Sequence, residues 1–164
     1  MVSDTTCNSW SDMTIRIGFY GTGFISRTHS WFLKHSTADH RIVAVHDPAT
    51  DRAQAFADRV GAEVVAEDEL LDRVDAVFVT TWTSEHERLV AAAAARGVAV
   101  FSEKPLAVDA TVAQRMVDAV ETAVRAALLS SRIEAAGIDA STAESLTQLR
   151  VRLQSERITD TGKG

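Results

Sequence analysis

The chain has 164 residues, of which 46% are hydrophobic, and its 23 acidic and 17 basic residues give a formal net charge of −6. This length predicts one domain, or one domain and a fragment, with enough apolar residues for a packed core. The excess of acid and the lack of a basic run interleaved with aromatics argue against a nucleic-acid surface. No apolar segment approaches the roughly 20 residues that a membrane helix needs, so we expect a cytoplasmic protein with no membrane partner.

The first residues are polar and precede a segment that resembles a natural start. Met13 begins MTIRIGFYGTG, and we therefore expect residues 1–13 to be a disordered leader without a structural task. The only cysteine, Cys7, lies in this leader. The sequence therefore offers neither a disulfide framework nor a cysteine metal cluster.

The most informative segment is IRIGFYGTGFIS, which predicts a buried strand, a glycine-rich turn and a helix that begins at Phe24 and Ile25. Gly21 can adopt the positive φ of a tight turn, and Gly23 lets backbone amides approach a phosphate. The positive end of the helix dipole then faces the anion. Ser26 stands where G-x-G-x-x-G has its third glycine, and a glycine turn without any ligand is the alternative.

A second apolar run, RIVAVHD, ends in Asp47, 21 positions after Ser26. A dinucleotide fold places a ribose-binding acid at about this distance, and such an acid repels a 2′-phosphate, which favours NAD over NADP. Asp47 and Pro48 also suit the start of the next helix, and both roles can hold together.

Strand and helix patterns continue to alternate down to about Ala127. A helix over 49–60 ends at Gly61, and Ser84 with Glu87 predicts a capping box for a helix that Gly97 ends. Asp109 is expected to cap a long helix. The other predicted elements are a short strand over 62–65, an acidic helix over 67–73, a central strand over 75–81 and a fifth strand from Val98. The long last helix has an apolar face made by Val112, Met116, Val120, Val124 and Leu128.

This order predicts an α/β fold, a Rossmann-like doubly wound parallel sheet of about five strands over residues 14–127. Residues 128–164 add no strong strand, and we expect them to form a helical or irregular tail. Ser141 and Glu144 suggest one last amphipathic helix there, with Leu146, Leu149 and Leu153 as a packing face.

Three segments closely resemble the Gfo/Idh/MocA family of oxidoreductases. They are GFYGTGFISRTHS, VAVHDPATDRAQAFADRVGA and TTWTSEHERLVAAAAARGVAVFSEKPLA, which together cover roughly residues 14–127. The most specific of their motifs is Glu103-Lys104-Pro105 at the end of the fifth strand. The resemblance implies a dinucleotide-binding domain of an enzyme that acts on the CH–OH groups of sugars or polyols.

The resemblance also implies roles for single residues. Lys104 would contact the substrate as the catalytic residue, where partial burial can ease its deprotonation, and the following peptide bond is commonly cis. A solvated lysine on a surface turn is the alternative. Glu103, Thr81, Trp82 and His86 are expected near the cofactor.

For two of these residues the alternatives stay open. Trp82 departs from the family's proline and either covers the dinucleotide or anchors the loop against the sheet. His86 is either near the cofactor or a capping or surface histidine. The remaining histidines do not combine into a metal site, since His29 and His35 do not share a helix face and the neighbours of His40 and His46 are apolar.

The family's substrate domain would follow the last strand, and the segment ALLSSRIEAAG stands where a sixth strand is expected. Either the gene is truncated or frame-shifted past about residue 125, which we favour, or the short form is functional and its tail covers the sheet edge. The candidate functions are an NAD-dependent oxidoreductase, a non-catalytic NAD(H)-binding module or regulatory subunit, and a nonfunctional remnant. A homo-oligomer is compatible with the sequence.

Overall fold

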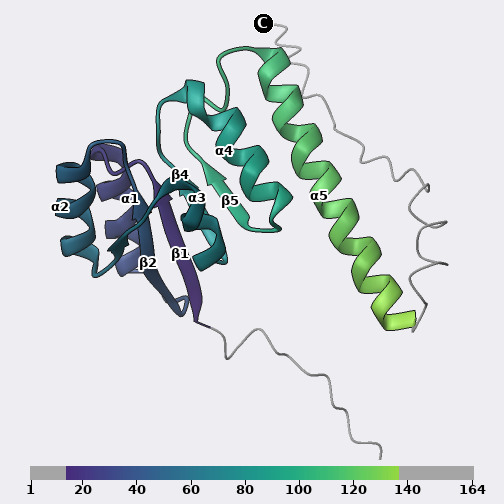
Figure 1. Ribbon diagram of the computed structural model, residues 1–164, viewed down its shortest axis with the longest axis horizontal. Helices are drawn as coiled ribbons and strands as arrows, with labels where there is room; N and C mark the ends of the chain where they lie inside the picture. The colour runs from purple at the N-terminus through teal and green to yellow at the C-terminus, as the bar shows by residue number, and fades with distance from the viewer. Residues whose placement is uncertain (1–13, 137–164) are drawn as a thin grey trace, which may run out of the picture.

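A five-stranded parallel sheet forms the centre of the computed structural model, which describes residues 14–136 (Figure 1). The strand order is β3-β2-β1-β4-β5, and every neighbouring pair is parallel. The strands are β1 (Ile15–Tyr20), β2 (His40–His46), β3 (Glu63–Val64), β4 (Ala76–Val79) and β5 (Ala99–Ser102). The carboxyl ends of all strands therefore meet at one edge of the sheet. The predicted Rossmann-like sheet is confirmed.

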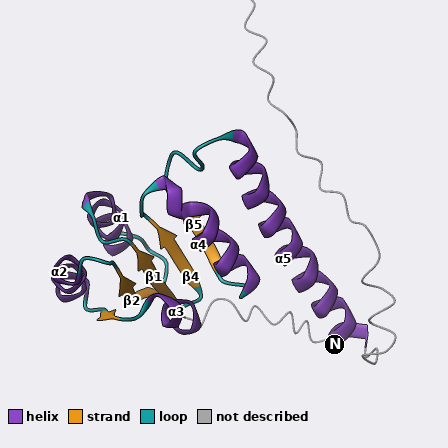
Figure 2. Ribbon diagram, turned by 45° about the horizontal axis from the view of Figure 1, so that its top comes forward, coloured by secondary structure: helices purple, strands orange, loops and turns teal. Residues whose placement is uncertain are grey.

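Helices cover both faces of the sheet (Figure 2). On one face lie α1 (Phe24–Lys34) and α2 (Thr50–Val60). The other face carries α3 (Glu67–Leu70) with its 3₁₀ turn η1 (Leu71–Arg73), α4 (Thr83–Ala95) and α5 (Ala110–Ala136). In Figure 1, α5 lies beside α4 and continues beyond it.

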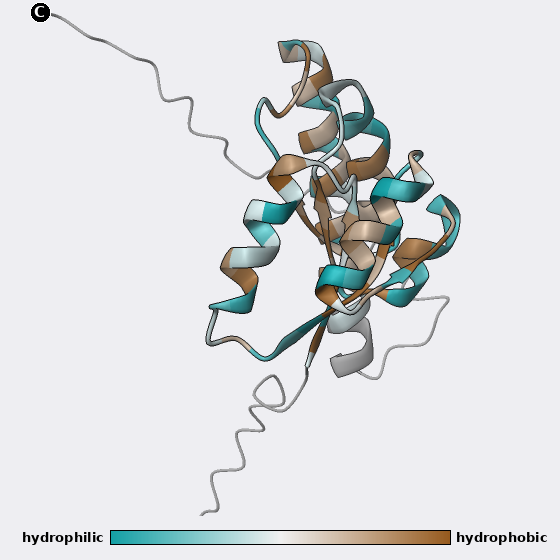
Figure 3. Ribbon diagram, turned by 90° about the vertical axis from the view of Figure 1, so that its left-hand side faces the viewer, coloured by the Kyte–Doolittle hydropathy of each residue, from teal (hydrophilic) through white to brown (hydrophobic). Residues whose placement is uncertain are grey.

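Each face of the sheet has its own apolar core, because successive side chains of a strand point to opposite faces. Ile17, Phe19 and Val45 pack with Phe56 and Ala57 of α2 on the first face. The Phe19 ring stacks on Phe78 at 4.9 Å and meets Phe56 edge-on at 5.4 Å. The core of the second face is made by Tyr20, Ala44, Val65, Leu70, Leu71, Val74, Val77, Val79, Leu89, Val90, Ala93 and Met116. Figure 3 shows the hydrophobic strands enclosed between the helices.

The predicted helix ends are mostly confirmed. Gly61 and Gly97 follow α2 and α4 with φ of 74° and 69°. The carboxylate of Asp109 accepts a hydrogen bond from the amide of Val112 at 2.9 Å, so this residue caps α5 as predicted. The capping box of α4 is wrong: the helix begins at Thr83 without a side-chain cap. Glu87 instead pairs with an arginine of α5.

Two strands are shorter than predicted. β4 ends at Val79 rather than at Thr81, because the chain turns away after Thr80, whose amide still donates to the carbonyl of Tyr20 at 2.9 Å. At its other end, Asp75 lies outside the strand and pairs with Arg16 at 2.7 Å. β3 has only two residues, since only they pair with β2.

The apolar face of α5 is only partly covered. Met116 is buried, whereas Val120, Val124 and Leu128 are 39%, 43% and 54% exposed. The helix extends to Ala136 through the segment where a sixth strand was expected, so within the described residues β5 is an edge strand.

Predictions for the leader with Cys7 and for the tail beyond residue 136 lie outside the described residues. Among residues 14–136, none of the helices has the length and apolar character needed to cross a bilayer.

Candidate functional site

Four loops follow the strands at the carboxyl edge of the sheet and carry most of the predicted site residues; Phe24 and Ile25 begin α1, and His86 lies in α4. The loop after β1 holds residues 21–23, and Asp47 follows β2. The turn after β4 holds residues 81–82, and residues 103–105 follow β5. Because parallel strands end at a common edge, these loops lie along the edge at which open α/β sheets bind ligands in a crevice.

Gly21 cannot be replaced by another residue without strain. Its φ is +83°, and an added Cβ would lie 2.8 Å from the carbonyl oxygen of Thr80. Its amide donates to the carbonyl of His46 at 2.9 Å, which ties the turn to the end of β2. The glycine is therefore required by the fold itself, whatever the turn binds.

Gly23 differs, because nothing in the fold demands a glycine there. Its φ is −74°, and an added Cβ would meet no atom within 4 Å. It stands at the start of α1, which has no side-chain cap and no acidic residue in its first turn. The open space and the uncapped amides leave an anion-binding helix terminus.

Ser26 fits the third position of the glycine motif. Its side chain is fully buried, and its hydroxyl donates to the carbonyl of Gly23 at 3.0 Å. The neighbouring Phe24 is 83% exposed at the mouth of the turn. Serine is thus small enough to keep α1 close to the sheet, as predicted.

Asp47 is buried in a network of donors from the chain itself. Its Oδ2 accepts from the amide of Thr22 (2.8 Å), from the Thr22 hydroxyl (3.0 Å) and from Nε of Arg52 (2.9 Å). Its Oδ1 accepts from the amide of Ala49 (2.9 Å) and from Nη2 of Arg52 (2.6 Å). These donors fill the roughly four lone-pair positions of a carboxylate. A ribose can reach Asp47 only if Arg52 moves away.

The same network fixes the charge of Asp47. Burial alone would raise the pKa of this carboxyl, but the hydrogen bonds from Arg52, Ala49 and Thr22 outweigh it and lower the pKa to about 2. The side chain of Asp47 is 2% exposed and that of Arg52 is 50% exposed. Arg52 is therefore the solvent-exposed member of the pair.

The turn after β4 presents one exposed ring and one unpaired hydroxyl. Trp82 is 85% exposed, so it does not pack against the sheet as a loop anchor. The Oγ1 atom of Thr81 is buried and has no hydrogen-bond partner among the described residues. A buried hydroxyl without a partner is unfavourable and indicates that a partner can bind there.

His86 is neither a surface nor a capping residue, which corrects that alternative. It is 1% exposed, and its ring nitrogens lie 3.2 Å from the carbonyl oxygens of Leu106 and Thr81. The Ser102 hydroxyl lies 3.3 Å from its Nδ1 atom. The ring therefore joins the turn after β4 to the loop after β5.

Glu103 is held by a histidine that the sequence did not assign to it. Nε2 of His29 lies 2.6 Å from Oε1 of Glu103, while Oε2 accepts a hydrogen bond from the backbone amide of Lys104 at 2.7 Å. The contact with His29, and then the bond from Lys104, lower the pKa of the Glu103 carboxyl. The peptide bond between Lys104 and Pro105 is cis, as the resemblance implied.

Lys104 itself is exposed, so the partial burial expected for it is absent from the described chain. No ion pair joins it to any described residue, and its ammonium group remains available to a ligand at the crevice. Glu103 and His29 therefore fix the backbone of the loop after β5 and not the side chain of Lys104.

These features fit a nicotinamide dinucleotide. The open space at Gly23 and the uncapped amides of α1 suit a diphosphate, and the unpaired Thr81 hydroxyl lies on the neighbouring loop. Sequence reasoning missed Thr22, Arg52 and the pairing of His29 with Glu103. In the sequence, the only sign of Thr22 is its place between the two glycines of the turn. The only sign of Arg52 is its place in the first turn of the helix after Asp47.

A parallel sheet of this order, with a glycine-rich first turn and an acid after the second strand, defines the dinucleotide-binding Rossmann class. The chain belongs to the Gfo/Idh/MocA family, because the family model described as "Oxidoreductase family, NAD-binding Rossmann fold" matches residues 15–129. It is thus the NAD-binding Rossmann domain of that oxidoreductase family.

The curated relatives include inositol 2-dehydrogenases. The chain is 40% identical over 112 residues to that of Agrobacterium fabrum, a match that covers 65% of this chain and 33% of the relative. It is 43% identical over 116 residues to that of Acidiphilium cryptum, covering 68% and 34%. The chain therefore spans about a third of the length of these relatives.

Solved structures give the same coverage. A putative myo-inositol dehydrogenase from Sinorhizobium meliloti matches with a TM-score of 0.64 and 33% identity, over 67% of this chain and 34% of that one. The WlbA dehydrogenase from Bordetella pertussis, solved with NADH and UDP-GlcNAcA, matches with a TM-score of 0.65 and 28% identity. The match covers 69% of this chain and 34% of that one. A 3-ketoreductase from Actinomadura kijaniata, solved with NADP, matches with a TM-score of 0.62 and 30% identity. The match covers 68% of this chain and 35% of that one.

Proposed function

We propose that the chain binds NAD(H) in the crevice at the carboxyl edge of its sheet, as the nucleotide-binding part of an oxidoreductase that acts on sugar or polyol CH–OH groups. The observation that carries this proposal is the open space at Gly23 beside the uncapped start of α1. The backbone amides at Gly23, Phe24 and Ile25 would hold the diphosphate, since a helix N-terminus favours an anion.

On the adenosine side, Asp47 would accept hydrogen bonds from the ribose hydroxyls after Arg52 swings out. Arg52 is half exposed and supplies two of the donors to Asp47, so its departure leaves acceptor positions for a ribose. The carboxylate would repel a 2′-phosphate, and we therefore propose NAD rather than NADP as the cofactor. Thr81 and Trp82 would line the neighbouring wall, with the exposed indole over the dinucleotide.

At the other end of the crevice, Lys104 would donate a hydrogen bond to the reacting oxygen of the substrate. When bound, NAD would supply the acceptor for a hydride from the adjacent carbon, while the hydroxyl proton would leave to water. The Lys104 ammonium stabilises negative charge on that oxygen, while Glu103 and His29 hold the loop that positions it. His86 joins this loop to the turn after β4 and so fixes the position of the two loops relative to each other.

The proposal is tested by titrating the chain with NADH and following the fluorescence of the nicotinamide and of tryptophan. We expect saturable binding that NAD competes away and NADP competes away less well. No saturable signal from NADH would contradict the cofactor proposal.

The substrate proposal needs a separate experiment, because the chain spans only a third of the length of its relatives. A panel of sugars and polyols with NAD is followed at the absorbance band of NADH, and the Lys104→Ala variant is compared with the unchanged chain. We expect the variant to retain NADH affinity and to lose turnover. If NADH binds but no panel member is oxidised, the activity assigned to this chain is wrong while its cofactor binding stands.

A further inference from the structure

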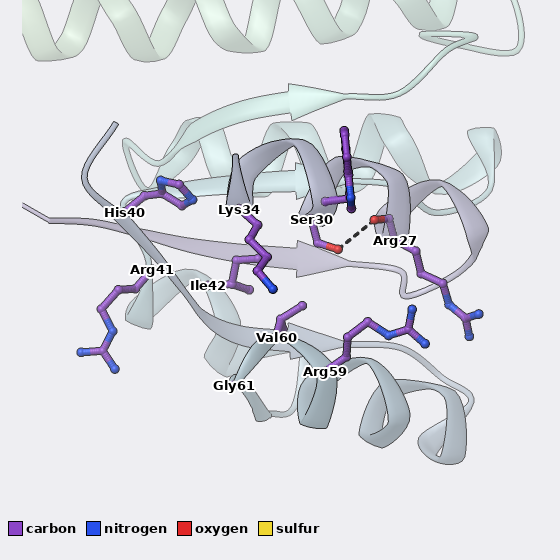
Figure 4. Close-up of a pocket in the computed structure, with 10 residues that line it drawn as sticks. Arg27, Ser30, Lys34, His40, Arg41, Ile42, Arg59, Val60 and Gly61 are labelled. Carbon is purple, nitrogen blue, oxygen red and sulfur yellow. Dashed lines mark hydrogen bonds between the residues drawn. The ribbon is translucent and has the colours of Figure 1, made fainter. Parts of the chain in front are cut away.

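A hollow lies between α1, α2 and the amino-terminal end of β2, and its lining extends to Arg27 near the start of α1. Its volume is about 560 Å³, and its lining residues are Arg27, Ser30, Trp31, Lys34, His40, Arg41, Ile42, Arg59, Val60 and Gly61. We call it the basic groove. Figure 4 shows Lys34 from α1 and Arg59 from α2 extending over it, with Arg27 at one end and Arg41 pointing outward at the other.

The cations of this groove differ from the other cations of the described chain. Seven arginines form ion pairs with carboxylates: Arg16, Arg52, Arg73, Arg88, Arg96, Arg115 and Arg125. Among residues 14–131, whose side chains are described, the basic side chains without an ion pair are Lys104 and the four that line the groove, Arg27, Lys34, Arg41 and Arg59. None of the described residues that line the groove is acidic.

This grouping is unexpected in a chain with a net charge of −6. Unpaired cations that line one hollow repel one another, and a bound anion would reduce that repulsion. The isolated Lys104 lies at the crevice, where we propose that it contacts a substrate oxygen. Within residues 14–131, the groove is the other place where positive charge stays unpaired.

The groove also has an apolar part. Ile42 and Val60 are partly buried within it, and Trp31, another of its lining residues, is 57% exposed. The Trp31 ring packs against His35 at 4.3 Å and keeps more than half of its surface exposed. Such a ring suits a ligand that joins a planar base to a multiply charged anion. None of the residues predicted to bind the dinucleotide lines this hollow.

We propose that the basic groove binds an oligophosphate anion of the kind carried by a nucleoside diphosphate or triphosphate, at a site separate from the glycine-rich turn. Lys34, Arg59 and Arg27 hold the phosphates, since guanidinium groups bind phosphate oxygens through paired hydrogen bonds. Trp31 and the apolar floor contact the base.

The test is calorimetric titration of the full chain with tripolyphosphate and with ATP, without added metal. We expect both to bind, with ATP tighter, and the affinity of both to fall when salt rises from about 50 to about 200 mM. The double variant Lys34→Gln with Arg59→Gln should weaken both roughly tenfold or more. The matched control, Arg73→Gln with Arg96→Gln, removes the same charge on the opposite face and should leave both affinities unchanged.

A second variant separates this site from the dinucleotide crevice. Gly23→Ala should leave the binding of tripolyphosphate and ATP unchanged, whereas the groove variants should leave NADH binding unchanged. Loss of ATP binding in Gly23→Ala but not in the groove variants would place the nucleotide at the glycine turn and overturn the proposal. Equal losses in the groove and control variants, or no heat with either probe up to about 1 mM, would also overturn it.

Tryptophan fluorescence distinguishes the free oligophosphate from the nucleotide. We expect ATP to quench the emission of Trp31 and tripolyphosphate to leave it nearly unchanged, because only ATP carries a base. The Trp31→Phe variant should lose this quenching while it still binds tripolyphosphate. Quenching by ATP that persists in Trp31→Phe would show that the base does not lie in the groove.

Discussion

The two glycines of the first turn serve different purposes, and substitution separates them. Gly21→Ala forces a side chain into a left-handed conformation and against the Thr80 carbonyl, so we expect a loss of about 2 kcal/mol or more in the free energy of unfolding. The methyl of Gly23→Ala meets no atom of the described residues, so the free energy of unfolding should change by less than about 0.5 kcal/mol. Its NADH affinity should nevertheless fall, because the new methyl occupies the space proposed for the diphosphate.

Urea denaturation and NADH titration of both variants measure these effects. The Gly23→Ala variant is its own control for folding, since its unfolding midpoint should match that of the unchanged chain. Undiminished NADH affinity in that variant would remove the main support for the proposed function.

Asp47 and Arg52 have opposite effects on the choice of cofactor. The carboxylate of Asp47 repels the 2′-phosphate of NADP, whereas the guanidinium of Arg52 attracts it. Asp47→Ala removes the ribose acceptor and leaves Arg52 without its partner, so we expect weaker NADH binding and a smaller preference for NADH over NADPH. Competition titrations with both reduced cofactors check this. An unchanged preference would show that Asp47 serves only the turn and the start of α2.

The hydrogen bonds to Asp47 also predict how stability depends on acid. Its folded pKa is about 2, below the ordinary value of 3.8, so its contribution is present above pH 3.8 and is lost as the pH falls through 2. A shift of this size corresponds to about 2 kcal/mol. Unfolding free energies measured between pH 5 and pH 2 should therefore fall more steeply for the unchanged chain than for Asp47→Asn. Parallel curves would contradict the assigned pKa.

At this scale the sequence located the residues better than it predicted their surroundings. Spacing from the glycine turn identified Asp47, but it could not show that Thr22 and Arg52 already fill the carboxylate. That depends on how α2 starts after β2, which no local pattern encodes. The contact of His29 with Glu103 joins residues 74 positions apart and was equally hidden.

Among the elements, the starts of the helices give the clearest contrast between a real cap and an apparent one. Asp109 caps α5 through the amide of Val112, so Asp109→Ala should lower the free energy of unfolding by about 1 kcal/mol. Ser84 lies inside α4, past its start at Thr83, and Ser84→Ala should change stability by less than about 0.5 kcal/mol. Thermal unfolding by circular dichroism compares the two. A larger loss in Ser84→Ala would restore the predicted capping box.

Periodicity predicted the type and order of the elements well, because each strand of this sheet is a short apolar run between helices with polar outer faces. It failed at boundaries that tertiary contacts decide. β4 stops at Val79 because Thr80 turns back toward Tyr20 and Gly21, to whose carbonyls its hydroxyl donates at 3.0 and 2.9 Å. The β-branched run continues to Thr81 and gives no sign of that turn.

At the scale of the whole molecule, the sequence predicted the layers but not the uneven charge on their surface. The cations of the basic groove are spread from Arg27 to Arg59 along the chain, and the sequence shows no basic run. They come together only because α1 and α2 lie side by side on one face of the sheet. A net negative charge therefore does not exclude a local anion site.

The packing of α5 provides the last prediction, because among its side chains over 110–131, those near the start of the helix contribute to the core. Met116 is 1% exposed in the core of the second face, so Met116→Ala should lower the free energy of unfolding by about 2 to 4 kcal/mol. Val124, two turns further along the same face, is 43% exposed, and Val124→Ala should lower it by less than about 1 kcal/mol. Chemical denaturation of the full chain at low protein concentration measures both values. A loss for Val124→Ala as large as that for Met116→Ala would mean that this stretch of α5 is covered in solution.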